Sequence, residues 1–121
     1  MLNKYLILII FLLLGCGQGF KLDGFDQEKW QLDVDGCNLD RLTMTDSIMA
    51  RKSALIGLSQ NEIIDVFGKP SRLELYSRNK KAFVYFIGGG PACDDKNESN
   101  KKFIIRFDGV GRAKEIILYK N

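Results

Sequence analysis

The sequence contains 121 residues, which is enough for one compact domain and too few for two. Its 18 lysines and arginines face 15 aspartates and glutamates, a balance too even to indicate binding to nucleic acid or to an anionic membrane surface. It contains no histidine and therefore lacks the commonest general base and the commonest metal ligand of proteins.

Residues 1–15 have the features of a signal for export. Lys4 supplies a positive charge, and residues 5–14 form an apolar run that is too short to span a membrane as a helix. The Leu-Leu-Gly that precedes Cys16 resembles the lipobox of bacterial lipoproteins, in which the chain is cut before the cysteine and the thiol is lipidated. The alternatives are a short uncleaved anchor and an ordinary signal peptide in which Cys16 is incidental.

The lipobox resemblance implies a location and a tether. Lipid on Cys16 would hold the chain in the cell envelope, and no other cofactor is expected. Gly17 is not the aspartate that retains enterobacterial lipoproteins in the inner membrane, so we expect the outer membrane, facing the periplasm. Residues 16–24 are glycine-containing and polar and are expected to form a flexible tether. A single domain is expected over residues 25–121.

Two cysteines, Cys37 and Cys93, remain in this domain once Cys16 is lipidated. An even pair in an exported domain predicts a disulfide, because the compartment oxidises thiols. The rival interpretation is a redox or catalytic thiol. It is weaker because the chain has neither a Cys-x-x-Cys motif nor a histidine partner.

Two helices are predicted, after a short helical turn near Trp30 that Asp26 could cap. Residues 39–55 carry apolar side chains at loose helical spacing, without an interrupting glycine or proline. Residues 59–67 begin with a capping box, in which the first serine and the glutamate three positions later satisfy each other's backbone amides. Gly68 then suits the left-handed residue that ends a helix.

After the second helix the pattern alternates, as in strands. Polar and glycine-rich turns separate the alternating segments, so consecutive strands should pair as a meander. The expected fold is α+β, with two helices packed on a three- to four-stranded antiparallel sheet. The expected strands cover residues 72–76, 82–87, 102–107 and 113–119.

Residues 57–71, GLSQNEIIDVFGKPS, resemble the second-helix signature of the SmpA/OmlA lipoproteins, the BamE-like small subunits of the outer-membrane β-barrel assembly machinery. The aromatic segment 84–86 and the Phe-Asp-x-x-Gly hairpin at residues 107–111 follow in the order of that family. The resemblance implies a divergent member with a BamE-like or β-lactamase-inhibitor-like domain that binds protein partners and catalyses nothing. Barrel-assembly components are the partners that it suggests.

Catalytic and metal-binding motifs are weak in this chain. Residues 88–90 are three glycines, but they follow a strand and meet a proline, which does not fit a phosphate-binding loop. The acidic residues between positions 33 and 40 lack the spacing of a calcium loop. No serine lies in a Gly-x-Ser-x-Gly elbow. We therefore expect no catalytic residue, no metal and no enzyme activity.

Four aromatic residues are candidates for a binding surface, because a sheet covered on one side has a second face to spare. The alternative is that most of them fill the core. The candidates are Tyr76, Tyr85, Phe86 and Tyr119.

The sequence thus predicts a lipid-anchored, non-catalytic protein-binding domain, an accessory in outer-membrane protein assembly or envelope maintenance. The alternative is an inhibitor or immunity module that inserts the loop of residues 88–102 into an envelope enzyme. A third hypothesis is a structural lipoprotein whose partner has no signal in the sequence.

The anchor can be tested with a Cys16→Ser variant. Without the thiol no lipid can be attached, so we expect this variant in the soluble periplasmic fraction and the wild type in the membrane fraction. Fractionation followed by immunoblotting measures the distribution. A variant that stays fully membrane-bound would refute the lipobox hypothesis.

Overall fold

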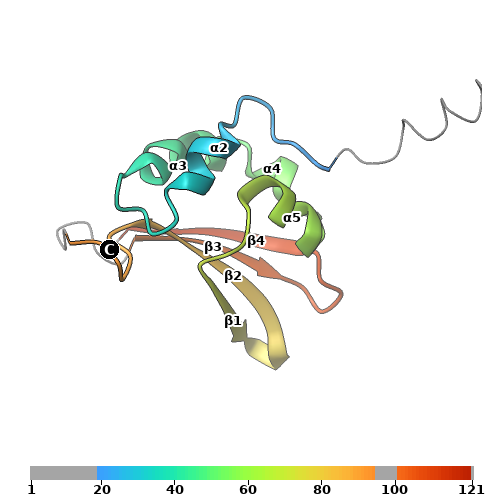
Figure 1. Ribbon diagram of the computed structural model, residues 1–121. Helices are drawn as coiled ribbons and strands as arrows, with labels where there is room; N and C mark the ends of the chain where they lie inside the picture. Colours follow the sequence, from blue (N-terminus) through green and yellow to red (C-terminus); the bar gives the residue numbers. More distant parts are fainter. Residues whose placement is uncertain (1–18, 95–100, 121) are drawn as a thin grey trace, which may run out of the picture.

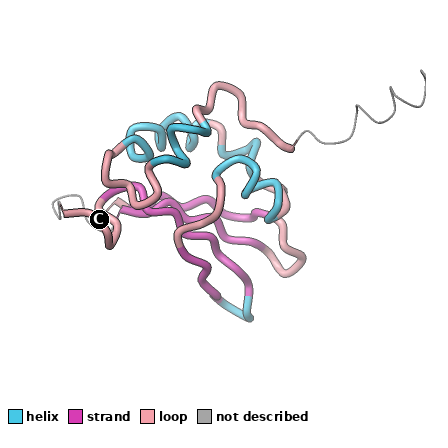
Figure 2. The backbone as a smooth tube through the Cα atoms, in the orientation of Figure 1, coloured by secondary structure: helices cyan, strands magenta, loops and turns pink. Residues whose placement is uncertain are grey.

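The computed structural model describes residues 19–94 and 101–120, in which a layer of helices covers one face of a four-stranded antiparallel sheet (Figure 1, Figure 2). Cys16 and the predicted signal peptide lie outside the described residues. Within the described ranges, no helix has the length and apolar character needed to cross a membrane. The elements are α2 (Gln27–Leu32), α3 (Asp40–Ala50), α4 (Lys52–Leu55), α5 (Gln60–Phe67), β1 (Arg72–Tyr76), the 3-10 turn η1 (Ser77–Asn79), β2 (Lys80–Gly88), β3 (Lys101–Phe107) and β4 (Ala113–Tyr119).

Helix α5 begins and ends as the sequence predicts. The Ser59 side chain accepts from the Glu62 amide at 3.2 Å, and the Glu62 carboxylate accepts from the Ser59 amide at 3.1 Å. Gly68 has a φ of 76°, a conformation that L side chains rarely adopt. The capping box is therefore confirmed. The helix buries Ile63, Val66 and Phe67.

The prediction of one helix over residues 39–55 is wrong. The structure has two helices there, because the chain turns at Arg51, where φ is −114° and ψ is 17°. No glycine or proline marks this break. The segment after α4 is tied to the start of β4: the Gly57 amide donates to the Ala113 carbonyl at 2.7 Å, and the Ala113 amide donates to Leu58 at 2.8 Å. The described residues contain four α-helices: this break divides one of the two expected helices, and the helical turn expected near Trp30 is the six-residue helix α2.

The strands follow the predicted meander. The sheet order is β1-β2-β3-β4, every pair is antiparallel, and the strand bounds differ from the predicted ones by two residues at most. Residues in register share a face, so one row across the sheet faces the helices and the next faces away. The core-facing side chains include Phe83, Tyr85, Phe103, Ile105 and Ile116.

Trp30 is the central residue of the core. Its side chain is fully buried, and its ring lies 5.3 Å from that of Phe67 and 5.9 Å from that of Phe103. The indole N–H donates to the Phe67 carbonyl at 3.1 Å, which satisfies the one polar atom that the ring buries. Asp26 caps α2 by accepting from the Lys29 amide, as the sequence indicated, and so fixes the helix that carries Trp30.

A disulfide joins Cys37 and Cys93, with 5.3 Å between their Cα atoms. It connects the segment between α2 and α3 to the loop that follows β2. The Gly90 amide donates to the Asp35 carbonyl at 2.9 Å in the same place. A Cβ atom on Gly36 would lie 2.4 Å from the Ile87 carbonyl carbon, so only glycine lets the two segments approach this closely.

The disulfide closes a long loop and should contribute strongly to stability. For the double variant Cys37→Ser, Cys93→Ser we expect a free energy of unfolding lower by roughly 4 kcal/mol, because the unfolded chain regains the freedom that the bridge removes. Urea unfolding followed by Trp30 fluorescence measures it. Reductant should destabilise the wild type and leave the double variant unaffected; equal sensitivity of both would contradict the bridge.

Candidate functional site

The structure separates the four aromatic residues predicted as a binding surface. Tyr85 lies in the core, where its hydroxyl donates to the Gly68 carbonyl at 2.9 Å. Phe86 and Tyr119 share one row on the outer face, because each lies opposite Lys102 in its strand pair. Tyr76 lies at the opposite end of that face. Only part of the predicted set is thus brought together, and Tyr85 is not available at the surface.

Arginine side chains cover two of these aromatic rings. The Arg72 guanidinium lies 5.3 Å from the Phe86 ring centre, and that of Arg106 lies 5.2 Å from the Tyr76 ring centre. The Tyr76 hydroxyl also donates to the Phe107 carbonyl. In these cation–π contacts, an arginine of the same molecule covers one face of each ring. The outer face of the sheet is therefore less open to a partner than the sequence suggested.

An exposed apolar pair lies instead on the other face, at the edge strand β1. Leu73 and Leu75 are 53% and 63% exposed. Leu73 lies opposite the core residue Phe83, so both leucines are on the face that carries the helices. The helical layer stops short of β1, which projects beyond it (Figure 1). On β1, the sheet face that the helices bury elsewhere is therefore exposed to solvent.

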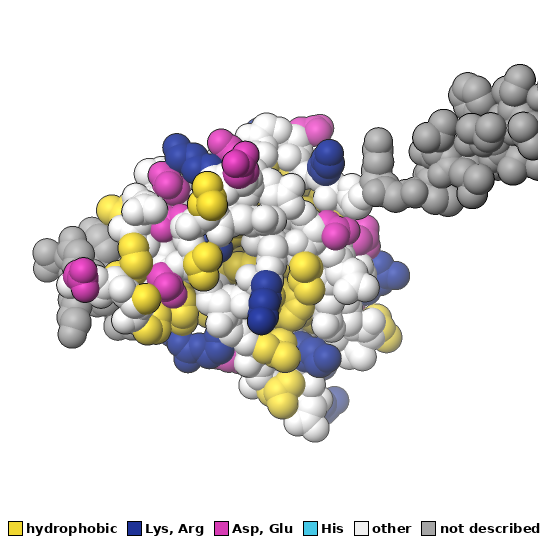
Figure 3. Space-filling model, viewed as in Figure 1, with side chains coloured by type: hydrophobic (Ala, Val, Ile, Leu, Met, Phe, Trp, Pro, Cys, Tyr) yellow, Lys and Arg dark blue, Asp and Glu magenta, His cyan; other side chains and the backbone are white. Residues whose placement is uncertain are grey.

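Basic side chains border this leucine pair. Lys81 lies directly opposite Leu75 in the strand pair, and Lys69 is exposed just before β1. Glu74 points to the opposite face and forms an ion pair with Arg72 at 3.5 Å. Figure 3 shows hydrophobic side chains over the region of β1 with lysine or arginine side chains beside them. The surface is thus apolar with a basic border.

A second candidate feature is the buried arginine of α3. Arg41 is only 2% exposed, and its guanidinium donates to the carbonyls of Trp30 at 2.8 Å, Val34 at 3.0 Å and Phe86 at 3.2 Å. It also lies 4.9 Å from the Trp30 ring centre. These contacts bring a full positive charge into the junction between the helices and the sheet.

Asp33 is a buried acid on the segment before Arg41, and its carboxylate binds backbone amides. Its two carboxylate oxygens accept from the amides of Asn38 at 3.0 Å and Arg41 at 3.2 Å. Burial lowers the pKa of Arg41 from its ordinary value, and the negative charge of Asp33 opposes that change. Burial raises the pKa of Tyr85 far above its ordinary value. In the structure both groups donate hydrogen bonds to backbone carbonyls.

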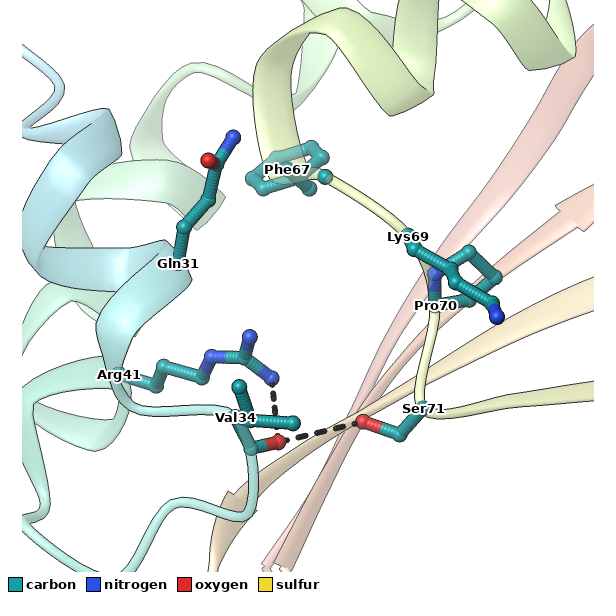
Figure 4. Close-up of a pocket in the computed structure, with 8 residues that line it drawn as sticks. Gln31, Val34, Arg41, Phe67, Lys69, Pro70 and Ser71 are labelled. Atoms are coloured by element: carbon teal, nitrogen blue, oxygen red, sulfur yellow. Dashed lines mark hydrogen bonds between the residues drawn. The ribbon is translucent and has the colours of Figure 1, made fainter.

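Arg41 opens onto a hollow of about 470 Å³ between α2, α3 and the segment that joins α5 to β1. In Figure 4 one terminal nitrogen of the guanidinium bonds Val34, and the other turns into the open space between Gln31 and Phe67. Two cations and no carboxylate line this space. The lining residues are Gln31, Val34, Arg41, Phe67, Gly68, Lys69, Pro70 and Ser71.

The described residues contain no group of three or more cysteines and acids that could hold a metal ion. Comparison with known proteins finds no matching family model, curated protein or solved structure. The β1 edge and the Arg41 hollow must therefore be interpreted from their own chemistry. The sequence reasoning missed both. Leu73 and Leu75 look like ordinary strand residues, and nothing in the sequence distinguishes Arg41 from a solvent-exposed helical arginine.

The three-carbonyl contact of Arg41 can be tested by Arg41→Lys. An ammonium is a single point donor and cannot reach carbonyls on three segments, so we expect the free energy of unfolding to fall by about 2 to 3 kcal/mol. Denaturant unfolding measures the change. The control Arg72→Lys, on a half-exposed side chain, should cost less than about 1 kcal/mol. Equal costs for the two variants would contradict the structural role of Arg41.

Proposed function

We propose that the protein is a lipid-anchored component of the cell envelope whose domain binds a protein partner and performs no catalysis. Its role would be accessory, in outer-membrane protein assembly or envelope maintenance, as the resemblance of residues 57–71 to the SmpA/OmlA lipoproteins implies. The anchor would be the lipid on Cys16, and the preferred location is the outer membrane, facing the periplasm. The observation that carries the proposal is the apolar, uncovered edge strand β1.

An uncovered edge strand offers two kinds of contact to a partner. Among the described residues, no strand lies next to its outer backbone N–H and C=O groups, because β1 is the edge strand of the sheet. An extended segment can add to such an edge through main-chain hydrogen bonds, while alternate side chains meet the exposed leucines. Leu73 and Leu75 are spaced for that alternation.

The border of this surface defines the chemistry of the partner. Lys81 lies directly opposite Leu75 and Lys69 is exposed three residues before β1, whereas the acid of β1, Glu74, is on the opposite face. A partner segment that alternates apolar and acidic side chains would match both properties. We therefore assign the β1 edge to an extended, acidic segment of an envelope protein.

The position of the chain's start is compatible with tethering. In Figure 1 the described chain begins beside the helical layer, and β1 projects from the other side of the molecule. A lipid attached upstream of residue 19 would thus leave the β1 edge clear of the membrane surface. The segment between the lipid and the domain would set the reach of that edge.

The proposal predicts the effect of the double variant Leu73→Glu, Leu75→Glu on partner capture. Glutamates remove the apolar contact and repel an acidic segment, so we expect about a tenfold loss in recovery of barrel-assembly subunits from native envelopes. Affinity pull-down with quantitative mass spectrometry measures it. The control is Val110→Glu, which makes the same kind of apolar-to-acid change once, on an exposed side chain in the β3–β4 turn; each single variant of the pair, Leu73→Glu or Leu75→Glu, is its match in charge.

Two outcomes would contradict the proposal. Unchanged recovery by the double variant would show that the β1 edge does not bind the partner. Capture of a single hydrolase or toxin, with no barrel-assembly subunit, would favour the inhibitor or immunity module instead. Circular dichroism of the double variant establishes that a loss of capture is not a loss of fold.

A further inference from the structure

The Arg41 guanidinium makes its hydrogen bonds with backbone carbonyls and its ring contacts with Trp30 and Tyr85. Burial lowers its pKa and the negative charges of Asp33 and Asp35 oppose that change, but no carboxylate in the described ranges forms an ion pair with it. Buried charges in proteins are ordinarily paired, because an unpaired ion loses its hydration. The nearby acid Asp33 is committed to two backbone amides. The guanidinium therefore keeps the capacity to bind an anion.

We propose that the hollow beside Arg41 binds a carboxylate that is attached to an apolar group. The carboxylate would accept from the terminal nitrogen of Arg41 that faces the open space in Figure 4. Lys69, exposed on the far side of the hollow, would add a second positive charge at the rim. The apolar group would pack on Val34, Phe67 and Pro70.

The lining selects a carboxylate over a phosphate. One guanidinium nitrogen and one mobile ammonium can satisfy the two oxygens of a single negative charge. A phosphate needs several convergent donors, typically a run of backbone amides at a helix start or in a glycine-rich turn. The hollow lies instead at the end of α5, where Gly68 turns its carbonyl toward Tyr85. Three of the eight lining residues, Val34, Phe67 and Pro70, are apolar, and a hydrated dianion would gain nothing from them.

Two polar lining residues already have contacts within the protein. The Ser71 hydroxyl accepts from the Phe86 amide at 3.1 Å and donates to the Val34 carbonyl at 3.4 Å. Gln31 packs over Gly68, where an added Cβ would lie 3.2 Å from the Gln31 side chain. The free terminal nitrogen of Arg41 is therefore the donor that the hollow offers to a carboxylate (Figure 4).

Trp30 can report binding in the hollow through its fluorescence. It is the single tryptophan of the chain, and its ring lies 4.9 Å from the Arg41 guanidinium. Full-length protein in detergent is titrated with N-acetyl-leucine and with its neutral amide while Trp30 fluorescence is recorded. We expect the carboxylate to bind about tenfold more tightly than the amide, with an affinity that falls as salt is added. Isovalerate, and an acetylated tripeptide with a free or amidated C-terminus, distinguish a small acid from a chain terminus as the source.

Two glutamate substitutions provide a matched pair. Val34→Glu places a carboxylate inside the hollow and should weaken N-acetyl-leucine binding about tenfold, because the anion is then supplied by the protein itself. Leu32→Glu makes the same change two residues away, on a side chain that does not line the hollow, and should alter binding by less than about twofold. If Val34→Glu fails to fold, Lys69→Gln replaces it, with an expected loss of about threefold.

Three results would overturn the proposal. Equal affinity for the acid and its amide would exclude recognition of the charge. Equal losses in Val34→Glu and Leu32→Glu would show that the hollow is not the site. Displacement of N-acetyl-leucine by inorganic phosphate at equal concentration would define a general oxyanion site and not a carboxylate site.

Discussion

The contact on which the rest of the structure depends is that of the Arg41 guanidinium with the carbonyls of Trp30, Val34 and Phe86. These three carbonyls come from the end of α2, the segment after it and the end of β2, so one side chain from α3 holds three parts of the chain together. The Trp30 carbonyl also accepts from the Asp33 amide at 3.3 Å, and the Val34 carbonyl accepts from the Ser71 hydroxyl at 3.4 Å, so the guanidinium adds to contacts that these carbonyls already make. A lysine could not satisfy them, because only the guanidinium fork presents donors in several directions.

The polar ends of the core aromatic residues extend this junction to α5. The Trp30 indole donates to Phe67 and the Tyr85 hydroxyl donates to Gly68, so both fix the last turn of that helix. The Cys37–Cys93 disulfide closes the same region from outside. The helical layer is thus tied to one end of the sheet and leaves β1 uncovered at the other (Figure 1). The two candidate surfaces lie in different places: the hollow is beside the Arg41 junction, and the exposed leucines are on β1.

Local patterns predicted much of the fold. The capping box of Ser59 and Glu62 acts within one helical turn, and the alternation of residues 113–119 follows from the pleat of a strand, so neither depends on distant contacts. The break at Arg51 could not be predicted in this way. The backbone turns at Arg51 without a glycine or proline, and the nearest long-range backbone hydrogen bonds, between Ala113 and residues 57 and 58, lie beyond the end of α4. Tyr85 was assigned to a possible surface because alternation gives two faces without saying which one is covered.

The sequence by itself determined the kind of elements, the order of the meander and the even cysteine pair, because each is encoded by residue type and short spacing. It also carries the lipobox before residue 16, whose lipidation stays a prediction. Only the tertiary structure decided which surfaces are open. Leu73 and Leu75 are exposed because the helical layer ends before β1, and Arg41 is buried because three distant carbonyls converge on it. The exposure of the two leucines and the meeting of three carbonyls at Arg41 both depend on how segments far apart in the sequence pack together. No local sequence pattern specifies that packing.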